Sequence, residues 1–571
     1  MDQPETGAAV AQAPLYPDVP NPDLLDRIPV TARLVVDVGC GTGALGAHYK
    51  RINPRARVFG IDAEPAAARI AATRLDRVAL VDVEHTPLPF DLAGQVDCLI
   101  YGDVLEHMKD PWRVLATQRS WLAPGGVVLA CVPNVEHWSL VLRLLQDRFD
   151  YEKDGLLDRQ HLRWFSRRTM QQALTEAGLP PIDVASRVFD AEQGRAFVAR
   201  ITPTLRALKV DPQAYAGRAL ALQYVWRARR EPVRTLHVLS TMLDPVGGVS
   251  QVRVVDPMRC LAADPTVRTQ LWDGRVVPTL DPATPKILIF HRPALTGEAG
   301  LLMLRSVVSP DTVVVTEFDD HPDYIPVLQN REVFNFRGVH AVQTTTPQLA
   351  AVLRTQNPEV AVFPNGVRAL PDVRNHARPG LTLFFGGLNR EADWQPHIGV
   401  LNAAAAAAGE RLRFTIVHDR ALFDSLETPH KSFTPTCDYP AYMQLLSDSE
   451  ISFMPLAENP FNRSKSDLKF IEAASCRVTA LASPVVYAES ITDGRTGVLF
   501  HGAEELRGKL LQMVANPSAV RAIGDAARAW VIEHRMLAYQ MQDRVAWYWS
   551  LWERRRELHR ALLSRVPELA A

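Results

Sequence analysis

Lysine and cysteine are scarce in this chain of 571 residues, and it has neither an excess of charge nor a long apolar run. The six cysteines are too scattered for a zinc site or a dense disulfide framework, which favours small buried hydrophobic side chains at these positions. No apolar run approaches the roughly 18–20 residues that a membrane span requires. The 63 basic and 64 acidic side chains leave a net charge of −1, so we expect no nucleic-acid partner.

The composition is ordinary for a soluble enzyme, with 47% hydrophobic and 22% charged residues. The N-terminal segment MDQPETGAAVAQAP lacks the basic-then-apolar pattern of a signal peptide, so we expect a cytoplasmic location. A chain of this length exceeds what one hydrophobic core can serve, which predicts two to four domains.

Short apolar runs alternate with helical segments in three successive series, which predicts an α/β protein with three Rossmann-like parallel sheets. The series open at LVVDVG, TLHVLS and LTLFFGG. The first thirty residues contain six prolines and no sustained periodicity, and a helix-rich stretch is expected to end near Arg230. We expect a leader over residues 1–30, a first domain over 31–230, two further domains over 231–375 and 376–535, and a helical tail over 536–571.

The segment VVDVGCGTG is a predicted strand that runs into a glycine-rich turn and then a helix. Gly39, Gly41 and Gly43 permit positive φ angles and let a ligand approach the backbone closely. The free N–H groups at the start of the next helix favour a carboxylate or phosphate. A nicotinamide site has a similar loop, but its usual spacing is Gly-x-Gly-x-x-Gly. Asp62 ends the next strand, where it can accept from ribose hydroxyls, and Asp82 ends the third.

Together with FGIDAE, VDVEHTPLPF, VDCLIYGDVLEHMKDPWRVL and LAPGGVVLACVPN, this segment resembles the class I S-adenosylmethionine-dependent methyltransferases over roughly residues 20–230. The resemblance implies S-adenosyl-L-methionine as cofactor. It assigns Asp37, Gly39 and Gly41 to the methionine end, Asp62 to the ribose and Asp82 to the adenine.

Three histidines are candidates for the base that removes the acceptor's proton: His107, His137 and His161. A sugar hydroxyl is a weak acid, so a nearby base would assist its attack on the methyl group. A purely structural hydrogen bond is the competing role for each histidine, and the pattern does not choose among them. No group of residues shows metal-ligand spacing, so we expect no structural metal, and a loosely bound divalent ion is left open.

The second half of the chain resembles the GT-B glycosyltransferases over about residues 235–560, because two Rossmann-like series precede a long helical tail. Lys465, Lys469 and Glu472 fall on one helical face, although a solvated face is the competing interpretation. Lysine is rare, with nine in the chain, so two of them four residues apart favour a site. Lysine ammonium groups can stabilise a diphosphate leaving group, and a carboxylate can accept from ribose hydroxyls.

This stretch resembles the donor-binding segment of GT-B enzymes that act on bacterial surface polysaccharides, including O-antigen. The resemblance implies a nucleotide-diphosphate sugar as donor and brings Arg390, in FFGGLNREADW, to the diphosphate. Many retaining members carry a glutamate eight positions before the one that matches Glu472, whereas this chain has Ser464. The pair Gly247-Gly248 forms either a ligand-binding turn or a simple tight turn. His291 and the pair Asp319-Asp320 are further candidates for the cleft between the two domains. A role in the core or in a turn is the competing interpretation.

The leading hypothesis is a bifunctional methyltransferase and glycosyltransferase of surface-polysaccharide assembly that acts on a glycan or lipid-linked oligosaccharide acceptor. Two alternatives keep the methyltransferase and make the GT-B half a non-catalytic glycan-binding module or a scaffold in a membrane-associated complex. The aromatic and basic tail AWYWSLWERRRELHRALL would cross back onto the first GT-B domain. Peripheral contact with the inner membrane is its alternative use. The sequence does not specify the oligomeric state.

Overall fold

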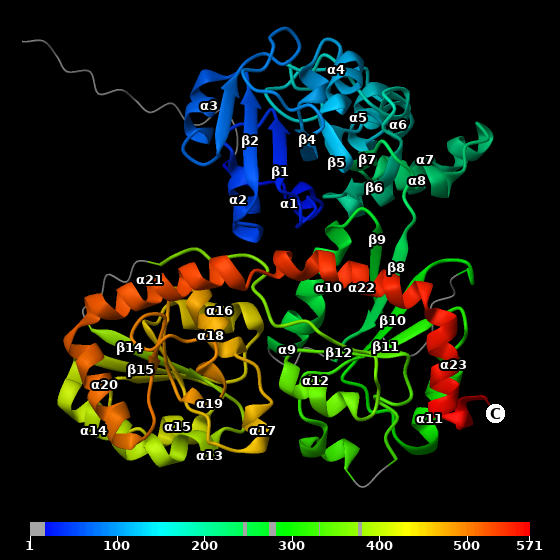
Figure 1. Ribbon diagram of the computed structural model, residues 1–571. Coiled ribbons are helices and arrows are strands. Elements are labelled where there is room, and N and C mark those ends of the chain that lie inside the picture. The colour runs from blue at the N-terminus through cyan, green and yellow to red at the C-terminus, as the bar shows by residue number, and fades with distance from the viewer. Residues whose placement is uncertain (1–17, 244–247, 273–280, 330–331, 375–379, 571) are drawn as a thin grey trace, which may run out of the picture. The chain divides into compact units, whose positions relative to one another are not determined.

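A computed structural model describes residues 18–243, 248–272, 281–329, 332–374 and 380–570 (Figure 1). The chain divides into two compact units, the first formed by residues 1–234 with 263–265 and the second by 235–262 with 266–571. The expected boundary between residues 375 and 376 lies outside the described residues. Among the helices that the structure describes, none is long and apolar enough to span a lipid bilayer.

The first unit is built on a seven-stranded sheet with strand order β3-β2-β1-β4-β5-β7-β6. Strands β1 to β5 run parallel, and β7 and β6 pair in antiparallel fashion at one edge. The strands are β1 (Leu34–Val38), β2 (Arg57–Asp62), β3 (Arg77–Leu80), β4 (Val96–Gly102), β5 (Leu122–Pro133), β6 (Pro181–Arg187) and β7 (Gln223–Arg229). The strand order reverses between β1 and β4, and ligands of open α/β sheets bind at such a switch point, outside the carboxyl ends of the strands.

Helices cover both faces of this sheet, as the parallel connections require. They are α1 (Pro22–Leu25), α2 (Ala44–Ile52), α3 (Pro65–Ala71), α4 (Pro111–Gln118), α5 (Trp138–Leu145), α6 (Arg167–Glu176), α7 (Ala191–Ala207) and α8 (Pro212–Ala219). All five residues of β1 are buried, in keeping with the continuous apolar run in the sequence.

The structure differs from the sequence-based expectation at two places in the first unit. Leu24 and Ile28 are buried in its core, so the packed unit begins before residue 31. The stretch that we expected to be rich in helix up to Arg230 contains β6 and β7. Val225 of β7 is fully buried between its neighbours and stabilises that edge of the sheet.

The second unit contains two six-stranded parallel sheets, of order β13-β12-β11-β10-β8-β9 and β16-β15-β14-β17-β18-β19. The first has β8 (Leu236–Thr241), β9 (Val267–Trp272), β10 (Lys286–His291), β11 (Val313–Glu317), β12 (Ala341–Thr344) and β13 (Val360–Val362). The second has β14 (Leu381–Gly386), β15 (Leu412–Val417), β16 (Lys431–Thr434), β17 (Ile451–Met454), β18 (Thr479–Ala482) and β19 (Val498–Leu499). Two Rossmann-like sheets in one unit are the architecture of a GT-B fold.

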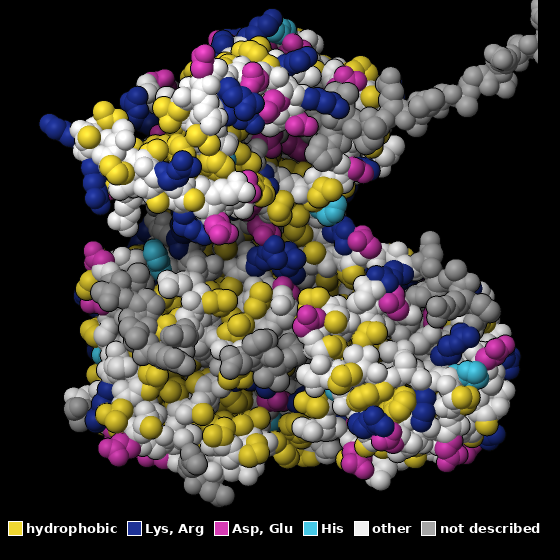
Figure 2. All heavy atoms as spheres, turned by 180° about the vertical axis from the view of Figure 1, so that it is seen from behind, with side chains coloured by type: hydrophobic (Ala, Val, Ile, Leu, Met, Phe, Trp, Pro, Cys, Tyr) yellow, Lys and Arg dark blue, Asp and Glu magenta, His cyan; other side chains and the backbone are white. Residues whose placement is uncertain are grey.

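Helices again cover both sheets (Figure 1). Those of the first sheet are α9 (Gly248–Ser250), α10 (Asp256–Ala263), α11 (Gly297–Val307) and α12 (Pro347–Arg354). Those that follow are α13 (Glu391–Trp394), α14 (Ile398–Ala408), α15 (Arg420–Ser425), α16 (Tyr439–Ser447), α17 (Pro460–Arg463), α18 (Leu468–Ser475), α19 (Pro484–Tyr487), α20 (Ala503–Ala515) and α21 (Pro517–His534). Basic and acidic side chains are interspersed over the face of the molecule that Figure 2 shows.

The tail consists of α22 (Met541–Glu553) and α23 (Arg555–Arg565), and it packs on the first sheet of the second unit. The Tyr548 hydroxyl donates to the side chain of Gln343 in β12 at 2.8 Å. Tyr548 and Trp552 are buried, and Leu562 belongs to the same core as the β10 and β11 side chains. These aromatic side chains therefore pack against protein, as the crossover prediction for the tail required.

Candidate functional sites

The glycine-rich loop between β1 and α2 takes a backbone conformation that suits glycine. Gly39, Gly41 and Gly43 have φ angles of 73°, 53° and 78°. A Cβ atom on Gly39 would lie 2.7 Å from the Cγ2 atom of Val104, which follows β4. The loop therefore lies directly against the chain that leaves β4, at the reversal point of the sheet.

Two buried carboxylates lie beneath this loop. Asp62 accepts the backbone N–H of Gly41 at 2.7 Å and that of Glu64 at 2.8 Å. Burial raises the pKa of Asp62 above its ordinary value despite these hydrogen bonds. Burial and the nearby Asp62 carboxylate raise the pKa of Asp37 to about 7. Because burial disfavours the ionised forms of Asp37 and Asp62, a bound cation such as an ammonium group would stabilise their negative charge.

Asp82 lies just beyond β3 and is exposed. Its carboxylate accepts the N–H of Glu84 and the Nδ1 of His85, both at 2.9 Å. Partial burial opposes ionisation, but these hydrogen bonds outweigh it and hold the pKa of Asp82 below its ordinary value. Asp82 is thus an ionised acceptor at the carboxyl edge of the same sheet.

The structure brings two of the three candidate histidines together. The rings of His107 and His161 lie edge to face, with their centroids 4.8 Å apart. His137 precedes α5 as its N-cap residue and contacts the Ser139 hydroxyl through Nδ1 at 2.8 Å. Burial lowers the pKa of His137 to about 4, so it stays neutral near neutral pH.

Glu106 is the neighbour of His107 and was not among the residues that the sequence singled out. Its side chain is only 2% exposed, and in the described part of the chain neither carboxylate oxygen has a hydrogen-bond partner. The available signal was an acid that directly follows the apolar pair Val104-Leu105 and precedes the candidate base His107.

In the second unit, a cavity of about 490 Å³ gathers charged side chains from both sheets. Arg390, Lys465 and Lys469, the three cations that the sequence analysis placed near a diphosphate, all line this cavity. Arg292, Asp319 and Asp320 of the first sheet face the same cavity. Arg292 had no recognised motif around it, so only the folded chain shows its place there.

The first sheet contributes an ion-pair cluster to this cavity. Arg292 pairs with Asp319 at 2.5 Å and with Asp320 at 3.1 Å. Lys465 pairs with Asp320 and lies 4.1 Å from the ring centre of Phe461. Burial lowers the pKa of Lys465 against the opposing effect of Asp320. An anionic ligand would compete with Asp320 for this lysine.

Lys469 and Glu472 lie on α18, but Lys465 precedes this helix, so the expected helical face of three residues is wrong for Lys465. The Lys469 Nζ atom donates to the Tyr442 hydroxyl at 2.7 Å and lies 3.5 Å from the Glu472 carboxylate. Glu472 is buried and accepts the Tyr439 hydroxyl at 3.0 Å through one oxygen. Gly248 begins α9, and a Cβ atom on it would lie 3.0 Å from the Tyr439 ring, so the backbone at Gly248 approaches this group closely. Gly247 lies outside the described residues.

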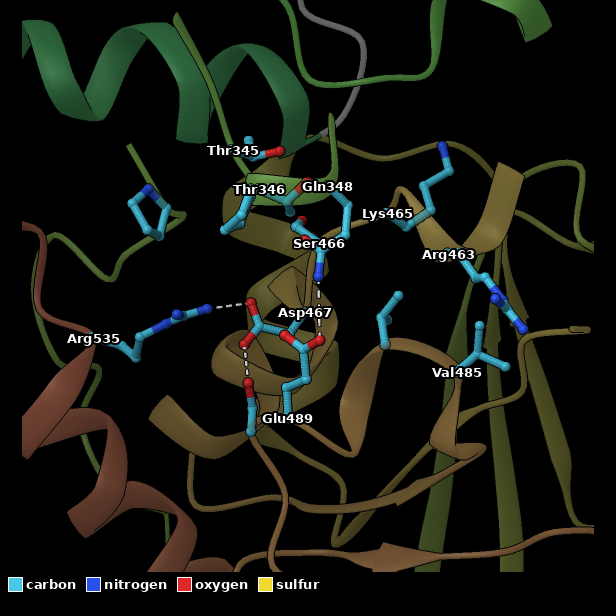
Figure 3. Close-up of a pocket in the computed structure, with 14 residues that line it drawn as sticks. Thr345, Thr346, Gln348, Arg463, Lys465, Ser466, Asp467, Val485, Glu489 and Arg535 are labelled. Carbon is cyan, nitrogen blue, oxygen red and sulfur yellow. Dashed lines mark hydrogen bonds and ion pairs between the residues drawn. The ribbon is translucent and has the colours of Figure 1, made fainter. Parts of the chain in front are cut away.

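A smaller pocket shares Lys465 and Ser466 with this cavity and lies between the start of α12, the segment before α18 and α19 (Figure 3). Asp467 pairs with Arg535 and accepts the Ser490 hydroxyl at 2.5 Å. Asn365 donates to the Ser466 hydroxyl at 2.9 Å and so links the first sheet to α18. These contacts hold Ser466 and Asp467, and with them the segment of chain that carries Lys465 and Lys469.

Two further residues from the sequence analysis, Ser464 and His291, are buried. Ser464 is buried, and its hydroxyl donates to the Phe461 carbonyl at 2.8 Å, so it serves the end of α17. His291 ends β10 at 2% exposure, and neither ring nitrogen has a hydrogen-bond partner among the residues described. Burial lowers the pKa of His291 to about 4.

Comparison with known proteins matches two separate parts of the chain. Residues 20–184 match the family described as "Methyltransferase domain", and residues 399–546 match the family described as "Glycosyl transferase-like". The chain therefore contains one region similar to methyltransferase domains and a second region similar to glycosyl transferases.

An uncharacterised 37.1 kDa protein of a Streptomyces fradiae transposon is 38% identical over 117 residues, which cover 20% of this chain and 33% of that protein. The chain thus spans about a third of that relative's length. The ubiquinone biosynthesis O-methyltransferase of Dinoroseobacter shibae is 26% identical over 171 residues, 29% of this chain and 68% of that enzyme. Among solved structures, HepE of Anabaena in complex with UDP and glucose is 14% identical, with a TM-score of 0.38 over 55% of this chain and 99% of that one.

Proposed function

We propose that this chain is a bifunctional enzyme of bacterial surface-polysaccharide assembly, of the O-antigen type. Its first unit methylates a hydroxyl of a glycan with S-adenosyl-L-methionine. Its second unit transfers a sugar from a nucleotide-diphosphate donor to a glycan, either free or lipid-linked.

The methyl donor is supported by the glycine loop and the acids below it. The loop offers backbone N–H groups at the start of α2, and Asp37 gains from a nearby ammonium group because an opposite charge favours its ionised form. In the reaction, a lone pair of the acceptor oxygen forms a bond to the methyl carbon. The C–S bond breaks with its electron pair left on sulfur, S-adenosylhomocysteine is released, and the hydroxyl proton must be removed.

A glycan acceptor is supported by a groove beside His161. The groove is open, has a volume of about 730 Å³ and is lined by Asp150, Tyr151, Arg159, His161, Leu162 and Trp164. Tyr151 and Trp164 are 49% and 38% exposed and both lie against the Phe149 ring. Exposed aromatic faces flanked by charged groups suit the apolar C–H faces and polar edges of sugar rings.

The observation that carries the glycosyltransferase proposal is the convergence of Arg390, Lys465 and Lys469 on one cavity. A departing nucleoside diphosphate develops negative charge, which cations fixed in a partly buried site stabilise more strongly than water does. Arg390 is held by Asn462 at 3.0 Å and by Asp393 at 3.1 Å, so its guanidinium is positioned before a ligand arrives. Covalent linkage of the two units raises the effective concentration of one product at the other site.

A second candidate function makes the GT-B half a glycan-binding module without catalysis. Ser464 favours it, since the hydroxyl is bonded to Phe461 and no carboxylate is supplied at that position. The membrane-scaffold alternative has less support, because Tyr548 and Trp552 of the tail are buried within the second unit.

Calorimetric titration of the full chain distinguishes these functions. S-adenosylhomocysteine and the diphosphates of uridine, guanosine, adenosine, cytidine and thymidine are titrated into the wild type, Asp62→Ala and Lys469→Ala. We expect two independent sites, each lost only with its own substitution. Binding of S-adenosylhomocysteine without a response to any nucleotide would overturn the donor site and favour the binding module.

A further inference from the structure

A buried acid and two histidines converge beside the predicted methyl-transfer site. Glu106 and His107 follow β4 in a short 3-10 turn (Leu105–His107), and His161 comes from the segment between α5 and α6. One ligand atom from each of these three residues lies within 4.8 Å of the other two. From the sequence we expected no metal-ligand cluster; the fold assembles one from residues far apart in the chain.

Backbone hydrogen bonds hold the two segments together. The Glu106 carbonyl accepts the N–H groups of Leu162 and Arg163, at 2.8 and 2.9 Å. Asp103 has a φ angle of 54°, in the left-handed region, and turns the chain as it leaves β4. The position of His161 next to His107 is thus fixed by main-chain contacts and does not depend on the side chains alone.

Both imidazoles are oriented in the manner of metal ligands. The Nδ1 atom of His107 lies 3.2 Å from the Gln160 carbonyl oxygen, and that of His161 lies 3.2 Å from the Leu156 carbonyl oxygen. A carbonyl oxygen can only accept, so each Nδ1 carries the hydrogen and each Nε2 carries the lone pair. Metal-binding histidines commonly donate their second ring N–H to a backbone carbonyl in this way.

The Glu106 carboxylate supplies the observation that points to a ligand. A buried polar group without a partner costs free energy, and an unpaired buried charge costs more. Glu106 is almost fully buried, at 2% exposure, and among the described residues both oxygens lack a hydrogen-bond donor. A divalent cation between the carboxylate and the two imidazoles would satisfy all three groups.

We propose that Glu106, His107 and His161 bind one divalent transition-metal cation, which holds a hydroxyl of the methyl acceptor. Two imidazoles and one carboxylate suit Zn²⁺, Fe²⁺ or Co²⁺ better than Mg²⁺, and three protein ligands leave positions open for acceptor oxygens. Tyr151 and Trp164 line the groove beside His161, where the rest of a sugar would lie. The assignment of the acceptor rests on the proposed methyltransferase function; the cation site itself does not.

The cation would act as a Lewis acid on the acceptor. A bound hydroxyl loses its proton more readily, and the proton passes to a water molecule in the open groove. The oxygen lone pair then forms the bond to the methyl carbon, while the C–S electron pair stays on sulfur. The contact between Gly39 and Val104 places the cofactor loop against the same stretch of chain that carries Glu106.

The test is metal binding by the untagged full chain. After chelator treatment and dialysis, Co²⁺, Zn²⁺ and Mg²⁺ are titrated separately into the wild type, Glu106→Gln, His161→Ala and a control, His501→Ala. His501 is an exposed histidine of the second unit. Binding of S-adenosylhomocysteine by each variant reports whether the first unit is folded.

We expect about one Co²⁺ or Zn²⁺ per wild-type chain, with visible Co²⁺ absorption that indicates nitrogen ligands. Loss of an outer-shell partner alone costs 10–100-fold, so Glu106→Gln and His161→Ala should weaken binding by at least about 100-fold. His501→Ala should match the wild type. Equal affinities in all four proteins, or binding of Mg²⁺ alone, would overturn the site. If S-adenosylhomocysteine binding and methyl transfer both persist in metal-free protein, the proposed role of the cation in methyl transfer is overturned. The proposed methyltransferase function is then still supported.

Discussion

Replacing Gly39 with alanine adds one Cβ methyl group, which should disturb both the glycine-rich loop and the chain after β4. An alanine at a φ angle of 73° costs about 1–2 kcal/mol in backbone strain. Its Cβ atom would also lie 2.7 and 2.9 Å from the Cγ2 and Cβ atoms of Val104, and overpacking of this kind costs about 1–3 kcal/mol. Gly39→Ala should therefore destabilise the first unit by about 2–5 kcal/mol.

Gly94→Ala is a matched control in the same unit. Gly94 has a φ angle of 67°, and no described heavy atom lies within 4 Å of the place that a Cβ atom would take, so this variant carries the backbone strain alone. Hydrogen exchange of peptides from β1 and β4, measured by mass spectrometry on the full chain, gives the local free energy of opening. Titration of S-adenosylhomocysteine reports the loop itself. The reasoning is refuted if Gly39→Ala is no less stable than Gly94→Ala and binds S-adenosylhomocysteine like the wild type.

Three further predictions concern the cofactor acid, the cation and the tail. Because the pKa of Asp37 is raised to about 7, this carboxyl group is mostly protonated at pH 6 and mostly ionised at pH 8. S-adenosylhomocysteine should therefore bind about tenfold more tightly at pH 8 than at pH 6. An affinity that does not change with pH in calorimetry would contradict a contact between Asp37 and the ligand's ammonium group. Chelator treatment should abolish methyl transfer and leave nucleotide binding intact, and added Co²⁺ should restore methyl transfer. Full methyl transfer after chelation would contradict the proposed role of the cation. Trp552→Ala removes a buried side chain and should destabilise the second unit by about 3–5 kcal/mol in denaturant unfolding, without increased membrane partitioning.

The fold was accessible from the sequence because parallel strands covered on both faces appear as continuous apolar runs. β1 and β10 are buried along their whole length, and both were visible in this way. The antiparallel edge formed by β6 and β7 was missed, since β6 is only partly buried and shows no such run. The burial of Leu24 and Ile28 was also missed, because these residues stand in a short stretch with two prolines and three charged residues that shows no sustained apolar pattern.

The candidate sites differ in how much of them the sequence could predict. Gly39, Asp62 and Lys469 stand in local motifs, so a linear pattern is enough to single them out. Glu106 and His161 meet only through main-chain hydrogen bonds between distant segments, and no spacing rule describes such a pair.

The central claim is that one chain performs both transfers on a glycan. The most direct measurement incubates the full chain with methyl-labelled S-adenosylmethionine, a panel of sugar-labelled nucleotide-diphosphate donors and a polysaccharide-derived acceptor. We predict that both labels appear in the glycan, that Asp62→Ala removes only the methyl label and that Lys469→Ala removes only the sugar label. A methyl label without sugar transfer from any donor would contradict the account.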